Sequence, residues 1–212
     1  MHAQKQFGIS LIEIMIGLAI LGISMAWAMP NYSVWMQNTQ IRNMAESITG
    51  GLQHARSEAI GRNAAAEFLL TDQNPSDAIA QTLLPALAVD TGTNWMVRVV
   101  LPPPGPPQYA YVIGNVGAAG SAMATVQAGN INIGGGLNAV TFDNFGRVLA
   151  ANADASLPIV KICVGSSALT PAQGARLLEV NISAGGQVKM CDPSVVDPTD
   201  PRRCLTPAPR CT

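Results

Sequence analysis

Side chains that could support catalysis are scarce in this 212-residue chain. Histidine occurs only at His2 and His54, so a Ser-His-Asp or Cys-His arrangement would depend on His54. His54 stands beside Arg56 and Glu58 in a segment of helical periodicity, where a solvated or packing role is expected. The glycines at 134–136 are not followed by the Lys-Ser/Thr of a phosphate-binding loop. The sequence therefore predicts no catalytic residue, no cofactor and no enzyme.

Cysteine chemistry is confined to the last quarter of the chain. An even number of cysteines beyond a hydrophobic N-terminus is typical of disulfides formed in an oxidising compartment. No pair has C-x-x-C spacing, so neither zinc binding nor thioredoxin-type chemistry is expected. We predict structural disulfides and no metal site for the four positions Cys163, Cys191, Cys204 and Cys211.

The expected strand order limits how these cysteines pair. If strand 176–183 lies between 159–164 and 186–191, Cys191 falls opposite about Leu178 and Cys163 lies on the other side of the same strand. Their separation would be about 9–10 Å, beyond the roughly 7 Å that a disulfide tolerates between Cα atoms. Two pairings remain, Cys191–Cys204 with Cys163–Cys211 or Cys191–Cys211 with Cys163–Cys204. The first is preferred because its short loop closes at lower entropic cost.

Basic residues near the C-terminus offer a possible contact for nucleic acid. Lys189, Arg202 and Arg203 could gather on one face of a disulfide-closed loop, and arginine suits bidentate phosphate contacts. Three aspartates share this stretch, and three phosphate contacts bind weakly at physiological salt. The net charge of −1 supplies no global basic field. A solvated tail is favoured, with DNA binding as the alternative.

One acid, Glu13, interrupts an apolar run from Ile9 to Met29. As a helix this run would span about 31 Å, which matches the hydrocarbon core of a bilayer. Lys5 precedes the run and no charge follows the run until Arg42, so residues 1–8 should stay cytoplasmic and the remainder should face the periplasm. A lone carboxylate inside such a run costs several kcal/mol unless it is paired or neutralised.

A cleavable signal peptide is the alternative interpretation of this N-terminus, because residues 26–28 (Ala-Trp-Ala) fit a signal peptidase site. Helical periodicity, however, continues past that point to a stop at Gly61 and Asn63. A discarded signal need not stay in phase with the mature chain, so we predict one helix with an apolar half at 9–29 and an amphipathic half at 30–63. The apolar positions of the second half are Val34, Ile41, Met44, Ala45, Ile48, Leu52, Ala55 and Ala59.

Residues 64–212 carry the pattern of a β-rich domain. Only 12% of the chain is charged, and Gly and Pro occupy 20 and 15 positions, as suits a loop-rich extracytoplasmic domain. Residues 64–93 are expected to be a connection. Alternating apolar residues predict strands at 95–101, 109–113, 140–142, 147–149, 160–162, 178–182 and 188–190, with short candidates near 126 and 131–133. The predicted class is α+β, a stalk helix packed on one or two antiparallel sheets.

Residues 8–13 (Gly-Ile-Ser-Leu-Ile-Glu) resemble the type IV prepilin processing site. The resemblance implies cleavage after Gly8 by a prepilin peptidase and N-methylation of Ile9, although Ile9 and Ser10 replace the commoner Phe and Thr. Glu13 falls at the fifth place of the processed chain. A carboxylate buried among packed stalk helices needs a cation, and the N-terminal amine of a neighbouring processed subunit can supply it. Pro30 matches a proline common in pilin stalks, where a kink, a locally melted turn or a simple bend is expected.

Further stretches resemble the GspH/FimT/FimU minor pilin group, namely residues 52–60, 140–147, 186–193 and 200–204. This resemblance implies a minor type IV pilin that is inserted in the bacterial inner membrane with a periplasmic C-terminus. It would then join a pilus with other major and minor pilins and help to prime assembly. The alternatives are a type II secretion pseudopilin, whose relatives usually lack a cysteine-bearing tail, and a pilus-borne DNA receptor. The DNA-binding pattern of the group has arginines where this chain has Gln187 and Lys189.

Overall fold

The computed structural model describes residues 10–82, 89–101, 108–117, 121–129 and 137–204, without the side chains of 26–31. The chain divides into two compact units, residues 1–36 and 37–212. The first unit contains the beginning of helix α1 (Leu11–Arg62), which continues into the second unit. All other elements belong to the second unit.

The second half of α1 forms the spine of the second unit. Its apolar side chains recur every three or four residues, so they share one face, and that face is buried. The predicted amphipathic periodicity is thus confirmed from Ile41 to Ala59, whereas Val34, the first predicted position, is only half-buried. The buried residues, each no more than 1% exposed, are Ile41, Met44, Ala45, Ile48, Leu52, Ala55 and Ala59.

The helix ends where the sequence predicted. Asn63 has a φ of 49°, the left-handed conformation that commonly terminates helices. Its N–H donates to the Ile60 carbonyl, and the N–H of Ala64 donates to the Ala59 carbonyl. These two bonds form a Schellman cap, which satisfies carbonyls that have no partner within the helix.

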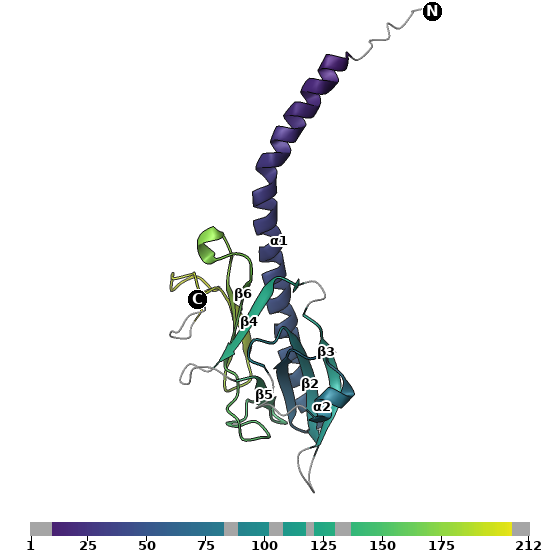
Figure 1. Ribbon diagram of the computed structural model, residues 1–212. Helices are drawn as coiled ribbons and strands as arrows, with labels where there is room; N and C mark the ends of the chain where they lie inside the picture. Colours follow the sequence, from purple (N-terminus) through teal and green to yellow (C-terminus); the bar gives the residue numbers. More distant parts are fainter. Residues whose placement is uncertain (1–9, 83–88, 102–107, 118–120, 130–136, 205–212) are drawn as a thin grey trace, which may run out of the picture. The chain divides into compact units, whose positions relative to one another are not determined.

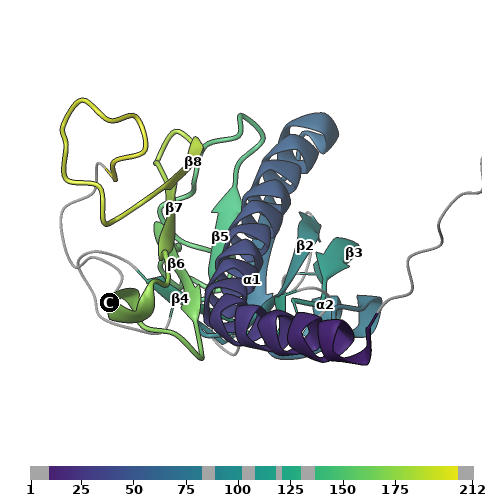
Figure 2. The same cartoon turned by 90° about the horizontal axis from the view of Figure 1, so that it is seen from above.

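Two four-stranded antiparallel sheets pack against this helix (Figures 1 and 2). Sheet A has the order β3-β2-β1-β5, and Figure 2 shows β2 and β3 on one side of α1. Sheet B has the order β4-β6-β7-β8 and lies on the other side. The bounds are β1 (Ala66–Thr71), β2 (Asn94–Leu101), β3 (Gln108–Asn115), β4 (Ala124–Gly129), β5 (Ala139–Phe142), β6 (Lys161–Ser166), β7 (Leu178–Ile182) and β8 (Val188–Cys191).

The predicted α+β class and antiparallel pairing are confirmed, but the interpretation of 64–93 as a connection was wrong. That stretch contains β1, which pairs with both β2 and β5, and the short helix α2 (Asp77–Thr82). All six residues of β1 are buried, so the strand lacks the polar-apolar alternation that marks a half-exposed strand. The predicted strand 147–149 is reduced to one bridge between Val148 and Phe142. The candidate at 131–133 lies outside the described residues.

The centre of sheet A holds a buried ion pair. Arg98 on β2 faces Glu67 on β1, with guanidinium–carboxylate distances of 2.6 and 2.8 Å and both side chains fully buried. Arg98 also donates to the Ala80 carbonyl of α2 at 2.6 Å and lies over the Tyr109 ring. Thr141 donates to the other Glu67 oxygen at 3.1 Å. Burial raises the pKa of Glu67, and the Arg98 guanidinium offsets part of that rise.

We expect Glu67→Leu to lower the free energy of unfolding by about 3–5 kcal/mol, because it leaves the Arg98 charge buried without its partner. The double variant Glu67→Leu/Arg98→Met removes both charges and should recover most of that loss. Denaturant unfolding of the detergent-solubilised chain would measure both. A double variant no more stable than the single one would show that the ion pair is not the source of the effect.

Candidate functional site: the assembly segment and the cysteine-closed tail

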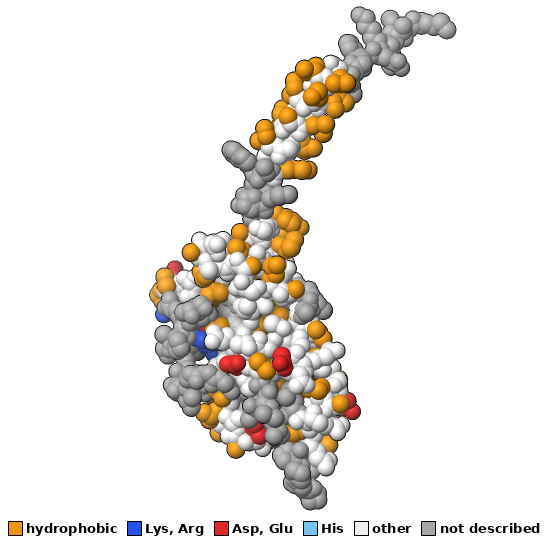
Figure 3. Space-filling view, viewed as in Figure 1, with side chains coloured by type: hydrophobic (Ala, Val, Ile, Leu, Met, Phe, Trp, Pro, Cys, Tyr) orange, Lys and Arg blue, Asp and Glu red, His pale blue; other side chains and the backbone are white. Residues whose placement is uncertain are grey.

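The first unit presents a helix that is apolar on every side. We call residues 11–25 the assembly segment. Its large apolar side chains are 51–78% exposed, and Figure 3 shows them along the helix. A helix with no polar face is stable only in apolar surroundings, which a bilayer or other such helices provide. The exposed residues are Leu11, Ile12, Ile14, Met15, Ile16, Leu18, Ile20, Leu21, Ile23 and Met25.

Within the described residues, no helix combines the length and the apolar character that crossing a membrane requires.

Glu13 lies in the first turn of α1. The Ser10 carbonyl accepts from the N–H groups of Glu13 at 3.0 Å and Ile14 at 3.3 Å, which starts the helix. A carboxylate at this position interacts favourably with the positive end of the helix dipole. No salt bridge to Glu13 forms within the described part of the chain. The predicted cleavage and methylation positions, Gly8 and Ile9, lie outside the described residues.

Pro30 does not interrupt the helix. The backbone of α1 is helical from Leu11 to Arg62, so the locally melted turn that the sequence allowed is absent. A proline removes one backbone N–H donor from a helix. The residues around Pro30 are otherwise compatible with a helix, so the loss of this one donor does not end it. The chain therefore leaves the assembly segment as helix and not as a loop.

Sequence reasoning missed an aromatic pair that follows Pro30. Tyr32 and Trp35 are 58% and 63% exposed, and their ring centroids lie 5.9 Å apart. The signal in the sequence was their spacing of three residues, which places two aromatic side chains on one helix face.

The tail is closed by a disulfide between Cys191 and Cys204, whose Cα atoms are 5.1 Å apart. This is the preferred pairing of the sequence analysis. Cys163 and Cys191 both lie opposite Glu179, on either side of β7, so the expected flanking arrangement is confirmed. Cys163 is also disulfide-bonded. Its predicted partner, Cys211, lies outside the described residues.

The predicted register at this hairpin was one residue off, since Cys191 faces Glu179 and not Leu178. The prediction used a two-residue turn at Ala184-Gly185. The hairpin instead uses three residues, with Gly186 at a φ of 76° and with Ser183 bonded to Gln187. A left-handed glycine that ends a three-residue loop adds one residue to the turn.

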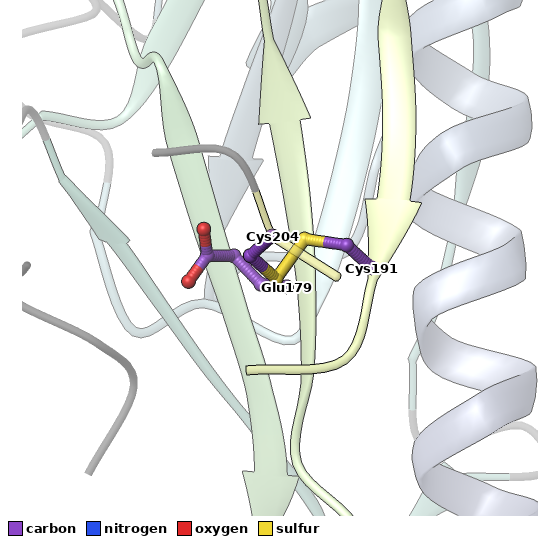
Figure 4. Close-up of side chains that lie close together, drawn as sticks. All are labelled: Glu179, Cys191 and Cys204. Atoms are coloured by element: carbon purple, nitrogen blue, oxygen red, sulfur yellow. A yellow bond between two sulfur atoms is a disulfide. The ribbon is translucent and has the colours of Figure 1, made fainter. Parts of the chain in front are cut away.

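Glu179 and the two bonded cysteines form a tight cluster (Figure 4). Their ligand-type atoms lie within 4.8 Å of one another, the separation expected around a metal ion. The two sulfurs are bonded to each other, however, whereas metal binding requires thiolates. Glu179 already pairs with Lys161 at 3.1 Å. The cluster is therefore a structural disulfide beside a buried ion pair.

The three basic residues of the tail differ in their surroundings. Lys189 is exposed on β8. Arg202 is also exposed but forms an ion pair with Asp200 at 2.7 Å, which lowers the pKa of Asp200 to about 2. Arg203 is half-buried, and its backbone bridges to Asp192. A phosphate would have to compete with Asp200 for Arg202, which weakens the case for DNA binding.

Comparison with known proteins adds two findings. Residues 3–29 match the prokaryotic N-terminal methylation motif. The chain is similar to two crystal forms of the type IV minor pilin FimU from Pseudomonas aeruginosa. One shows 16% identity over 70% of this chain and 90% of the crystallised FimU chain, with a TM-score of 0.40. The other shows 17% identity over 74% and 91%, with a TM-score of 0.44. No curated protein matches the chain.

The methylation motif leads into a long N-terminal helix, and that helix carries an antiparallel β domain. The chain thus combines a prokaryotic N-terminal methylation motif with a long helix packed on an antiparallel β domain.

We expect neither the wild-type chain nor the triple variant Lys189→Ala/Arg202→Ala/Arg203→Ala to shift DNA in an electrophoretic assay at physiological salt. Few phosphate contacts are available, and one arginine is already paired. A matched control removes three exposed arginines elsewhere, Arg42, Arg62 and Arg147. A salt-sensitive shift that the triple variant abolishes and the control retains would instead establish a DNA receptor.

Proposed function

We propose that the chain is a minor type IV pilin, processed by a prepilin peptidase and incorporated into a pilus. The observation that carries this proposal is the junction at the N-terminus. The methylation motif spans residues 3–29, and the helix that begins within it at Leu11 runs unbroken to Arg62. One continuous helix thus links an apolar segment, exposed on all sides, to the core of a β domain.

Processing would create the group that Glu13 needs. Cleavage after Gly8 leaves a free amine on Ile9, which is then methylated and remains cationic. When assembly segments pack side by side they exclude water, and a buried carboxylate without a partner is strongly unfavourable. The amine of a neighbouring subunit satisfies Glu13 at one axial offset between the two helices. The pair would therefore set the register between subunits, and an unprocessed chain could not form it.

The β domain would remain outside the packed helices and present its loops and tail. The Cys191–Cys204 disulfide closes a loop that follows β8, the last strand of sheet B, as suits a domain exposed to an oxidising environment. This tail supports a pilus subunit over a secretion pseudopilin, because pseudopilins of the resembled group usually lack a cysteine-bearing tail. Anchoring in the inner membrane before assembly, and association with major and other minor pilins, belong to this proposal. Priming of pilus assembly also belongs to it.

Glu13→Ala should be inserted and cleaved normally but poorly incorporated into filaments, because the register-setting ion pair is lost. Immunoblotting of sheared pili would measure the subunit in the filament fraction. The matched control is Glu46→Ala, which removes an exposed carboxylate of the same helix that pairs only with Arg42 among the described residues. Wild-type amounts of the Glu13→Ala chain in the filament fraction would remove Glu13 from assembly.

A further inference from the structure

The aromatic pair, Tyr32 and Trp35, lies largely exposed on the surface of α1. Both rings are more than half exposed, and they lie in a tilted arrangement with centroids 5.9 Å apart and an interplanar angle of 35°. Met36 beside them is 40% exposed. In water, two large rings on one helix face keep much of their apolar area exposed, which is unfavourable. Such a surface fits surroundings that are part apolar and part polar.

The pair stands where the chain changes character. The run before it is apolar, whereas Asn38, Gln40 and Arg42 follow within two turns. Tyrosine and tryptophan each join a large apolar ring to one polar group, the phenol O–H or the indole N–H. Side chains of this kind concentrate at the boundary between membrane hydrocarbon and water. The chemistry of the pair therefore matches the headgroup layer of a bilayer.

The spacing to Glu13 supports the same occupant. Tyr32 and Trp35 follow Glu13 by 19 and 22 positions, which at about 1.5 Å per residue corresponds to roughly 29 and 33 Å along a helix. The hydrocarbon core of a bilayer is about 30 Å thick. When the aromatic pair lies in one headgroup layer, Glu13 reaches the opposite one.

We infer that Tyr32 and Trp35 form an interfacial anchor that binds the lipid headgroup layer where the chain leaves the membrane. This inference rests on the membrane insertion contained in the proposed function. The anchor fixes the depth of the helix before assembly and holds Glu13 at the cytoplasmic boundary, where its charge stays hydrated. A shift of one helical turn, about 5.4 Å, would move Glu13 into hydrocarbon or pull the aromatic pair away from its boundary.

Depth-dependent fluorescence quenching of the full-length chain in phosphatidylcholine vesicles tests this inference. Brominated lipids place the quencher either near the headgroups or near the chain ends. Three chains are compared: wild type, Trp35→Phe and Trp27→Phe. All three retain Trp95 in the β domain, which serves as an unquenched reference. Its side chain is 6% exposed, and its indole N–H donates to the Ser47 hydroxyl.

The emission that disappears in Trp35→Phe should be quenched several-fold more by the shallow quencher than by the deep one. The emission that disappears in Trp27→Phe should show the opposite preference. Position 27 lies about 12 Å closer to Glu13 along the helix than position 35 does, and therefore deeper in the hydrocarbon. Quenching of Trp35 by neither lipid, by both equally, or best by the deep quencher would overturn the anchor.

Failure of the anchor is distinguishable from failure of the pilin proposal. A chain that is cleaved after Gly8 in cells but whose Trp35 is not quenched by the shallow lipid refutes the anchor alone. A chain with a shallow Trp35 that is never cleaved after Gly8 refutes the pilin proposal and supports the anchor.

Discussion

Burial of one face of α1 between two sheets is the interaction on which the rest of the second unit depends. Ile41, Ile48 and Leu52 are fully buried, and each contributes roughly 1.5–3 kcal/mol by leaving water. Gly51 lets the sheet approach, since a Cβ there would lie 2.9 Å from the rings of Phe68 and Trp95. Neither sheet alone could cover its apolar face, so the helix is required by both.

The end of this helix is tied to both sheets through backbone groups. Arg56 donates to the Gly146 carbonyl at 3.0 Å, in the turn that follows β5. Gly186 of the β7–β8 hairpin lies so close to the same carbonyl that a Cβ would overlap it at 1.8 Å. A side chain at Gly186 would therefore separate the hairpin from the turn.

An element could be predicted from the sequence when one of its faces is exposed to water and the other is buried. The buried face of α1 alternates with a polar one, so its period was readable, and Asn63 marked its end through a left-handed conformation. Strand β1 is buried on both faces and contains Glu67, so neither alternation nor uniform hydrophobicity identified it. The Arg98 that neutralises Glu67 lies 31 positions away, and no local pattern predicts that pair. The tail register was missed by one residue because Gly186, and not Gly185, takes the left-handed position.

We propose that one helix serves as both assembly segment and domain core, so its apolar half must remain on the mature protein. Mass spectrometry of the N-terminus of the membrane-extracted or filament-associated protein tests this most directly. We expect a mature chain that begins at Ile9 and carries a methyl group on its terminal amine. A mature chain that begins at Met29, with the apolar half removed after residues 26–28, would contradict it.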